Sequence, residues 1–464
     1  MIDLKASEIA KIVNGKLIGD DVLVTSAPVI NSTNSVTGSI FLALVGEKVD
    51  GHSFIKDAFE RGALLALVTR EVEERCIIVD DVVAALGALA SYVRNSLPDL
   101  VVIGITGSQG KTTTKDLLRH ILENVGKTVA PIGNYNNEIG APLTLLHCDR
   151  STRYCILEMG ARHIGDIAAL CKMARPNFGV VLKVGSAHLG EFGSEAAIAQ
   201  TKSEMISSLE DQATAILGQY DPFTIAMSSL HNGNTLTFGE TAKSDVRATD
   251  IDVREGRPHF DLVTPAGRAA VGLRIVGVHQ VANALAAAAV ATALGISIDV
   301  IASGLSTAEL DSKWRMEVRE LKDLILINDS YNSSPEAAAA ALRTLILFAQ
   351  EQGGNSWAFL GKMHELGASS PAAHAAIGTL ASEVGVDHLV CIGADEYVSE
   401  IGPNSQMTTH LFKEKPDALL LINQIKPGDV VLVKASRSEA FEEVALEIEK
   451  RWNERISEEV GDQE

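Results

Sequence analysis

The run from Thr106 to Thr113, Thr-Gly-Ser-Gln-Gly-Lys-Thr-Thr, has the residue types and spacing of a phosphate-binding loop. Its glycines let backbone amides turn inward, and Lys111 supplies a positive charge for the β and γ phosphates of a nucleotide. The Thr112 hydroxyl stands where a magnesium ion would be bound. A buried strand pattern precedes the loop and a helical pattern follows it, as a phosphate loop requires. The residues expected to form this nucleotide site are Thr106, Gly107, Ser108, Gln109, Gly110, Lys111, Thr112 and Thr113.

Three further side chains could complete such a site, and each has a plainer alternative. Glu158 closes the apolar run 154–157 at a strand end, where a carboxylate can bind magnesium or merely be solvated. His188 follows the apolar run 178–184 and could bind a metal or a phosphate, although a lone histidine is more often structural. Lys202 lies in a helical stretch, where a lysine is usually solvated. The same choice between surface charge and function is open for Arg315, His364, Lys434 and Arg437.

Two asparagine-rich segments also carry potential binding groups. The segment 133–140 must be a loop, because asparagine competes with helix and is depleted in strands. Its many amides favour a substrate-binding loop over a plain connector. The residues expected to bind there are Asn134, Asn136 and Asn137. The segment 328–335 has the same character, and its Asp329 could orient an incoming amine or cap the helix that starts with Pro335.

The composition excludes several classes of protein. With 46% hydrophobic and 22% charged residues, the chain is an ordinary folded protein. Acidic residues outnumber basic ones by 60 to 40, and the resulting charge of −20 argues against a nucleic-acid partner. Five scattered cysteines without a close pair argue against disulfides or a zinc site. Neither a signal-peptide pattern nor a sufficiently long apolar run is present, so we expect a cytoplasmic protein without a membrane span.

The elements that must position these residues form three α/β units, because 464 residues are too many for one core. Residues 1–82 alternate short apolar runs with one helical segment and carry no phosphate loop. In residues 83–311, a buried strand, a glycine-bearing turn and a helix begin a doubly wound parallel sheet of the P-loop ATPase kind. Short strands at 214–275 suggest an antiparallel excursion from that sheet. Residues 312–464 form a second, Rossmann-like alternation of strands and helices.

Taken together, these residues resemble the Mur ligases over nearly the whole chain. Two segments, GNYNNEIGAPLTLL and DSYNSSP, are specific to the branch that joins D-alanyl-D-alanine to UDP-N-acetylmuramoyl-tripeptide. The other segments that carry the resemblance are SIFLALVGEKVDGHSFIKDAFERGA, ITGSQGKTTTKD, LEMGARHIGDI, AHLGEFGS, IAQTKSE, GVHQVANALAAAA, WRME, MHELG with His374, and VLVKASRS.

The resemblance implies roles that spacing alone does not show. One magnesium ion would be bound by Thr112 and Glu158 and a second by His188, while Lys202 would be carbamylated and become a metal-binding anion. Carbamylation needs the neutral amine, which partial burial favours. The catalytic residues implied are Lys111, His188, Lys202 and Asp329. The contacts implied are Asn283 and Arg315 to ATP, and Ser32, Tyr331 and Asn332 to the other substrates.

The implied reaction uses ATP and two magnesium ions to form an acyl phosphate on the terminal carboxylate of the tripeptide. The amine of D-alanyl-D-alanine then displaces phosphate. The N-terminal unit would bind the uridine nucleotide. Because water must be kept from the acyl phosphate, we expect the C-terminal unit to swing over the central one after substrates bind. We expect the enzyme to be a monomer.

The sequence departs from the family pattern at several positions that face ligands. Asn31 and Thr33 flank Ser32 where the family usually has Asp and Arg, and Lys183 replaces a common Asn. Gly218 and Tyr220 occupy the Asn and Asp positions of the usual Asn-x-Asp, Gln280 replaces Asn, and Lys362 replaces Asp. A divergent but active ligase is favoured, because the phosphate and metal residues are intact. Two alternatives stay open: another ligase of the superfamily, adding glutamate to folate or the third residue to the wall precursor, and a nucleotide-gated binding module that hydrolyses ATP slowly.

Overall fold

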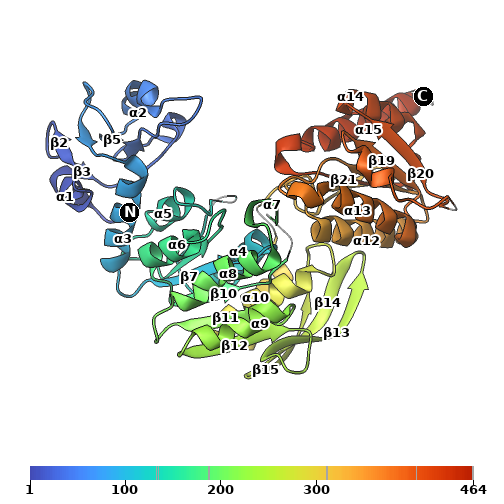
Figure 1. Cartoon of the computed structure of the whole chain (residues 1–464), viewed down its shortest axis with the longest axis horizontal. Coiled ribbons are helices and arrows are strands. Elements are labelled where there is room, and N and C mark those ends of the chain that lie inside the picture. The colour runs from blue at the N-terminus through green and yellow to red at the C-terminus, as the bar shows by residue number, and fades with distance from the viewer. Residues whose placement is uncertain (132, 134, 186–188, 310–311, 404, 462–464) are drawn as a thin grey trace.

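Three α/β bodies follow one another along the chain in the computed structural model (Figure 1). The structure describes residues 1–131, 133, 135–185, 189–309, 312–403 and 405–461. The N-terminal and C-terminal bodies stand on opposite sides of the central one, with the central sheet below both in Figure 1. The three-domain α/β architecture predicted from the sequence is confirmed.

The N-terminal body is built on a sheet of order β2-β6-β5-β4, in which only the β2–β6 pair is antiparallel. The helix expected near 54–63 is α2, which buries Ile55 and Ala58 in a small core with Phe41. A separate pair, β1 and β3, is antiparallel. The elements are β1 (Leu4–Lys5), α1 (Ala6–Ile12), β2 (Lys16–Ile18), β3 (Leu23–Val24), β4 (Ile40–Leu42), α2 (Ile55–Glu60), β5 (Leu65–Val68) and β6 (Cys76–Ile78).

The central sheet has the order β15-β14-β13-β12-β11-β10-β7-β9-β8, and its strands from β12 to β8 run parallel. The register sets Ile105 beside Glu158 and Thr106 beside Val181. The carboxyl ends of β7, β9 and β10 therefore meet at one edge, where doubly wound sheets bind their ligands. The strands are β7 (Val101–Thr106), β8 (Thr128–Val129), β9 (Tyr154–Glu158), β10 (Phe178–Val181), β11 (Thr214–Gly218), β12 (Asn234–Gly239), β13 (Val246–Arg254), β14 (Arg257–Thr264) and β15 (Gly267–Gly272).

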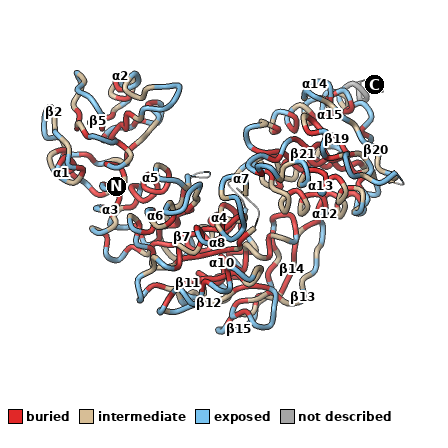
Figure 2. Tube along the Cα trace, in the orientation of Figure 1, coloured by how far each residue is buried: buried red, intermediate tan, exposed pale blue. Residues whose placement is uncertain are grey.

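Helices cover both faces of the central sheet, which explains why its strands are continuous apolar runs. Val102 and Leu157 belong to the core under α3, α5, α6 and α8, whereas Ile103 and Ile156 belong to the core under α4, α10 and α11. Figure 2 shows the strands of this sheet largely in the colour of buried residues. Within the described residues, no helix combines the length and apolar character needed to cross a membrane. The helices are α3 (Val82–Asn95), α4 (Lys111–Glu123), α5 (Gly140–Leu145), α6 (Asp166–Ala174), α7 (Leu189–Phe192), α8 (Glu195–Ser207), α9 (Pro222–Ala226), α10 (Gln280–Ala293) and α11 (Ile298–Thr307).

The antiparallel excursion expected at 214–275 is smaller than predicted. Strands β11 and β12 extend the parallel sheet, and antiparallel pairing is confined to β13, β14 and β15. The turn between β13 and β14 reaches the C-terminal body, where Gly256 lies against the ring of Phe348. The prediction was wrong for 214–239, because short strands do not reveal by their pattern which neighbour they pair with.

The C-terminal body has a sheet of order β16-β17-β21-β18-β19-β20, with antiparallel pairing only between β16 and β17. Helices α12 and α13 cover one face, and α15 covers the other. The elements are β16 (Glu317–Leu321), β17 (Leu324–Asn328), α12 (Pro335–Gln352), β18 (Ser356–Leu360), α13 (Ser370–Val384), β19 (His388–Ile392), β20 (Thr408–Phe412), α14 (Lys415–Ala418), β21 (Val430–Lys434) and α15 (Glu442–Gly461).

Candidate active site

The phosphate loop lies where the sequence predicted it, between the end of β7 and the start of α4. Gly107 and Gly110 have φ angles of 154° and 84°, which disfavour any other residue. A Cβ atom at Gly110 would also lie 2.1 Å from Oδ1 of Asn283. The ammonium of Lys111 folds back and donates to the carbonyl of Gly107 at 2.7 Å. The loop thus has the backbone shape and the cation that a polyphosphate needs.

Glu158 stands beside this loop at the end of β9, with its side chain fully buried. Both carboxylate oxygens lack a hydrogen-bond partner within the described part of the chain. Burial raises the pKa of Glu158, while the charges of Lys111, Lys115 and Arg315 oppose that rise. A buried carboxylate without hydrogen bonds is costly unless it faces a cation. These oxygens therefore fit a bound divalent ion, and the neighbouring Thr112 is buried at the same edge.

Lys202 is not the solvated lysine that its helical position suggested. It lies on α8 with only 7% of its surface exposed. Burial and the charge of Lys111 lower the pKa of Lys202 well below its usual value. The structure therefore brings Lys202 close to the phosphate-loop lysine and favours its neutral amine, the form that reacts with CO₂.

The segment after β10 is held tightly onto the phosphate loop. The Ser108 amide donates to the carbonyl of Lys183 at 2.9 Å, and the Ser108 hydroxyl accepts from the Gly185 amide at 2.9 Å. Asp221 accepts from the amide of Val184 at 2.9 Å. His188, predicted to bind a metal, lies outside the described residues. The described part of this segment ends at Gly185.

A pocket of about 70 Å³ opens beside Gly110, on the side of the loop that faces α10. Asn283, which was predicted to contact ATP, lines this pocket and donates to the side-chain oxygen of Gln280 at 2.7 Å. Burial lowers the pKa of His279 in this wall to about 4, so the imidazole is neutral near pH 7. The pocket lining is Gln109, Gly110, Leu182, Lys183, Tyr220, Phe238, His279, Ala282 and Asn283.

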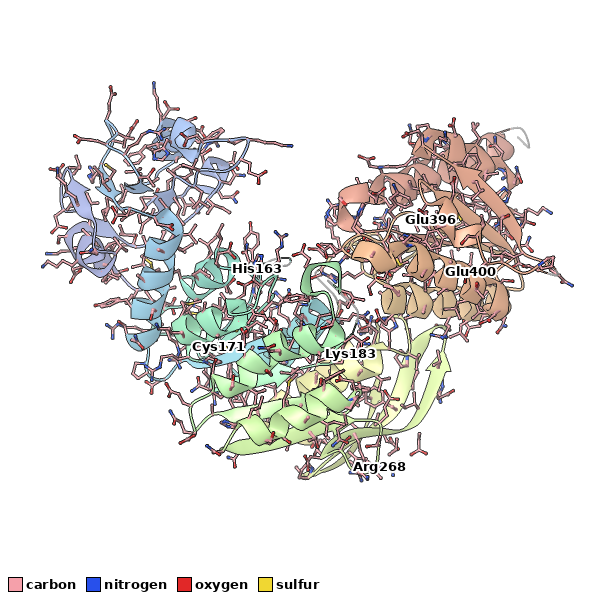
Figure 3. All side chains as sticks on the ribbon, in the orientation of Figure 1. His163, Cys171, Lys183, Arg268, Glu396 and Glu400 are labelled. Carbon is pink, nitrogen blue, oxygen red and sulfur yellow. The ribbon has the colours of Figure 1, made fainter. Side chains whose placement is uncertain are left out.

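Three of the departures from the family pattern gather at this pocket. Lys183, labelled in Figure 3, is the second residue after β10 and adds a positively charged side chain to the pocket lining. The Tyr220 ring packs at 59° to the ring of Phe238, with centroids 6.1 Å apart. At Gly218 a Cβ atom would lie 2.0 Å from the carbonyl oxygen of Leu182, so this backbone excludes the asparagine that is usual there. The departures therefore alter the walls of the pocket and leave the phosphate loop unchanged.

The C-terminal body supplies the loop 329–334, which faces the central site. Lys434, at the end of β21, is 1% exposed and donates to the Asp329 carboxylate at 2.5 Å and to the Asn332 carbonyl at 2.9 Å. The Asp329 carboxylate also accepts from the amide of Met316 at 3.0 Å. Asp329 thus shapes this loop, whereas the cap of α12 is Ser334. The sequence left Lys434 open as a surface charge, and its burial shows a structural role.

Arg315 and Tyr331, both predicted to contact substrates, form one unit at the domain boundary. The Arg315 guanidinium lies 3.9 Å from the centroid of the Tyr331 ring. Burial lowers the pKa of Lys111, and the charge of Arg315 adds to that lowering; the same charge opposes the raised pKa of Glu158. The C-terminal body therefore brings a positive charge to the phosphate loop.

The remaining predicted contacts lie in the N-terminal body and in the asparagine-rich segment before α5. Ser32 is buried in the N-terminal body, where its hydroxyl contributes most to lowering the pKa of Asp57. Asn137 accepts from the amide of Gly140 at 2.9 Å at the start of α5, and the Asn136 carbonyl accepts from the Gly160 amide at 2.8 Å. These bonds set the shape of the asparagine loop. Asn134 lies outside the described residues.

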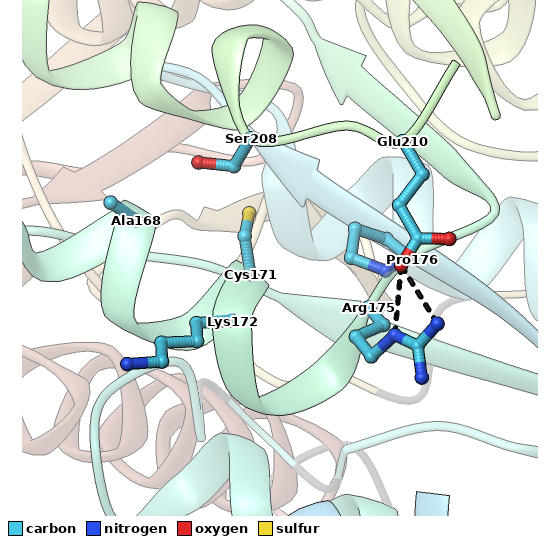
Figure 4. A pocket seen from close by; sticks show the side chains of 7 residues that line it. All are labelled: Ala168, Cys171, Lys172, Arg175, Pro176, Ser208 and Glu210. Atoms are coloured by element: carbon cyan, nitrogen blue, oxygen red, sulfur yellow. Dashed lines mark hydrogen bonds and ion pairs between the residues drawn. The ribbon is translucent and has the colours of Figure 1, made fainter. Parts of the chain in front are cut away.

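A second cavity, of about 330 Å³, is lined by α6, the residues that follow it, and the segment after α8 (Figure 4). The groups in its wall are not set up for catalysis. The guanidinium of Arg175, in the cavity wall, forms an ion pair with the carboxylate of Glu210 at 2.8 Å. Burial raises the pKa of the Cys171 thiol in its wall to about 12, which makes that thiol a poor nucleophile. The reactive groups are therefore concentrated at the carboxyl edge of the central sheet.

Comparisons with known proteins agree with this geometry. Residues 105–291 match the Mur ligase middle domain, and residues 314–437 match the Mur ligase glutamate ligase domain. A UDP-N-acetylmuramoyl-tripeptide--D-alanyl-D-alanine ligase from Mycobacterium tuberculosis is 38% identical over 96% of this chain and 97% of its own.

Solved structures give the same result. The crystal structure of MurF from Acinetobacter baumannii superposes with a TM-score of 0.88 at 32% identity, covering 97% of this chain and 99% of that one. MurF ligase from Thermotoga maritima in complex with ADP gives a TM-score of 0.81 at 32% identity, covering 93% and 99%. This chain therefore belongs to the Mur ligase family, in the branch of the UDP-N-acetylmuramoyl-tripeptide--D-alanyl-D-alanine ligases.

Proposed function

We propose that this protein uses ATP to join D-alanyl-D-alanine to UDP-N-acetylmuramoyl-tripeptide, giving the pentapeptide precursor of peptidoglycan, ADP and phosphate. Its relatives over almost the whole chain are ligases of this name. The observation that carries the proposal is the buried carboxylate of Glu158, which has no hydrogen-bond partner among the described residues and interacts electrostatically with Lys111 of the phosphate loop. Such a site accepts a polyphosphate together with a divalent cation.

Magnesium fits this site, and Thr112, Glu158, His188 and a carbamylated Lys202 are the residues that we propose would hold it. The bound ions would neutralise charge on the transferring phosphoryl group. Lys111 lies at the mouth of the loop and shares that task, since its ammonium can leave the Gly107 carbonyl for the γ phosphate. The neutral amine of Lys202, favoured by its lowered pKa, is the group that would bind CO₂.

We propose an acyl phosphate as the intermediate. The carboxylate of the tripeptide attacks the γ phosphorus and ADP leaves; the dipeptide amine then attacks the acyl carbon and phosphate leaves. The loop 329–334 faces the phosphate loop from the C-terminal body, and Tyr331 and Asn332 are the side chains proposed to hold the dipeptide. Arg315, stacked on Tyr331, brings a positive charge to the side of the loop where negative charge develops. Closure of the C-terminal body after substrate binding would exclude water.

The N-terminal body is proposed to bind the uridine nucleotide. Its Asn31 accepts from the amide and the hydroxyl of Thr33, at 3.0 and 2.9 Å. Asn31 therefore orders its own turn and leaves this position without the charges of the family's Asp-Ser-Arg. We also propose a cytoplasmic monomer, to be checked by light scattering of the purified protein.

The direct test measures phosphate release with ATP, magnesium and precursor tripeptide, with and without D-alanyl-D-alanine. A ligase releases phosphate rapidly only with the dipeptide and consumes one dipeptide per phosphate. Equal rates with and without dipeptide would instead support a nucleotide-gated module. Replacement of the dipeptide by glutamate or a diamino acid distinguishes the other ligases of the superfamily.

A further inference from the structure

The side chain of Gln109 crosses from the phosphate loop to the C-terminal body. Its amide nitrogen donates to the Ser334 hydroxyl at 2.8 Å and to the Glu336 carboxylate at 3.0 Å. The Ser334 hydroxyl in turn donates to the same carboxylate oxygen at 3.2 Å. These three side chains form a closed triangle of hydrogen bonds. Gln109 is more than two hundred positions away in sequence from both of its partners.

The triangle joins two loops that are proposed to bind substrates. The backbone of Gln109 is part of the phosphate loop, immediately before Gly110 and Lys111. Ser334 caps α12, where it accepts from the amide of Ala337 at 3.4 Å, and it ends the loop that carries Tyr331. One glutamine side chain therefore spans the distance between the loop proposed to hold the γ phosphate and the loop proposed to hold the amine.

We propose that Gln109 is a positioning residue that sets the amine-binding loop in register with the phosphate loop, so that the acyl phosphate meets the amine before water. This inference rests on the proposed ligase function. Without the register, water attacks the acyl phosphate, returning the tripeptide carboxylate and phosphate while ADP has already formed. The fault therefore shows as ATP consumed without a peptide bond.

The chemistry of Gln109 suits this task. Ser334 and the Glu336 carboxylate can both accept a hydrogen bond, and a neutral amide donates to them without adding charge beside the triphosphate. A hydrogen bond to a carboxylate is also stronger than one between neutral groups. A serine at this position would be too short, and a lysine would compete with Lys111 for the phosphates.

Other contacts keep the two bodies docked when this triangle is removed. The Ser312 hydroxyl donates to Asp116 on α4 at 2.8 Å. The amide of Gly190 donates to the carbonyl of Glu365 at 2.9 Å. The Glu336→Met variant should therefore fold with its bodies docked, which separates positioning from stability.

The experiment compares Gln109→Met, Glu336→Met and the double variant, with Glu351→Met on the exposed far end of α12 as the matched control. We expect each single variant to lower the ligation rate about tenfold, as for lost hydrogen bonds to a charged group. Phosphate released per dipeptide consumed should rise above the one-to-one value. The double variant should lie within about twofold of the slower single one, because both remove the same contact. The ATP affinity of the Glu336→Met variant, and both the rate and the stoichiometry of the Glu351→Met control, should match the unmodified chain.

A reciprocal exchange tests the hydrogen bond itself. Gln109→Glu should uncouple the reaction, because two carboxylates then face each other, and adding Glu336→Gln should restore coupling with donor and acceptor exchanged. Two results would overturn the proposal. One is a Gln109→Met, Glu336→Met double variant in which the two losses of ligation rate multiply; the other is a Gln109→Met enzyme with unchanged rate and one-to-one stoichiometry. If the unmodified chain itself forms no peptide bond, the proposed function fails instead.

Discussion

Replacing Lys434 by methionine should destabilise the C-terminal body strongly, because it strands a carboxylate. The Lys434 ammonium holds the Asp329 carboxylate at 2.5 Å, and the two side chains are 1% and 13% exposed. Methionine fills a similar volume but leaves the Asp329 charge with the Met316 amide as its remaining hydrogen bond among the described contacts. Removing one partner of a buried ion pair costs about 3–5 kcal/mol.

The retained bond to Met316 places the expected loss near about 3 kcal/mol, the lower end of that range. For a body of about 150 residues this corresponds to a melting temperature lowered by roughly 10 °C. The Lys434 variant should also have a raised KM for D-alanyl-D-alanine, since Lys434 holds the carbonyl of Asn332 in the amine-side loop. Its affinity for ATP should change little, because the phosphate loop belongs to another body.

Tryptophan fluorescence reports on the C-terminal body alone. All three tryptophans, Trp314, Trp357 and Trp452, lie in it, and the last two are buried. A multidomain chain need not unfold in one step, so a probe confined to one body is preferable to total enthalpy. The melting curve by fluorescence therefore measures the effect where it arises.

A double-mutant cycle decides the cause. Asp329→Asn in the Lys434→Met background removes the stranded charge and should recover at least about 2 kcal/mol relative to the sum of the single changes. Lys415→Met, which breaks a more exposed pair with Glu443, is the control and should cost at most about 1 kcal/mol. Additive single effects, or a Lys434 variant that melts like the control, would refute this reasoning.

Three other predictions concern the central body. Glu158→Gln removes the anion that faces the proposed cation, so the magnesium concentration for half-maximal ADP release should rise at least about tenfold; an unchanged requirement would exclude this acid as a ligand. Lys202→Ala should abolish activity and any stimulation of turnover by bicarbonate, whereas a response equal to that of the unmodified chain would rule out carbamylation there. Burial lowers the pKa of His279 from 6.5 to about 4, so the unfolded chain binds this proton at a higher pH than the folded chain does. The stability contributed by His279 is therefore complete above about pH 6.5 and is lost as the pH falls toward 4. His279→Asn should remove up to about 3 kcal/mol of that pH dependence in thermal melts.

Local chemistry made the phosphate loop predictable from the sequence. Its glycines occupy positive-φ positions, and the strand before it and the helix after it have clear periodicities. Glu158 was predictable for the same reason, since the last residue of a parallel strand must lie at the ligand edge. These features depend on a few neighbouring residues, which a sequence displays directly.

Burial and distant partners could not be read in this way. Lys202 and Lys434 looked like solvated cations, because a helix face or a strand end does not show what packs over it. The partners of Gln109 lie in another body, and only the fold brings them within hydrogen-bond distance. The prediction of antiparallel pairing at 214–239 was wrong for the same reason, because the sequence of a short strand does not show which strand pairs with it.

The departures from the family pattern become coherent once they are placed in the structure. Gly218 has no room for a side chain against the Leu182 carbonyl, and Tyr220 packs on Phe238 where the family has an acid. Lys183 adds a positive charge to the same pocket, which is therefore more aromatic and more cationic than the family pattern. Lys111 and Glu158, at the phosphate end, are unchanged. We propose that this pocket takes the base of ATP. Changes there should alter how tightly the nucleotide is held, whereas the groups proposed to act on the transferring phosphoryl group are retained, so divergence here should affect the KM for ATP more than kcat.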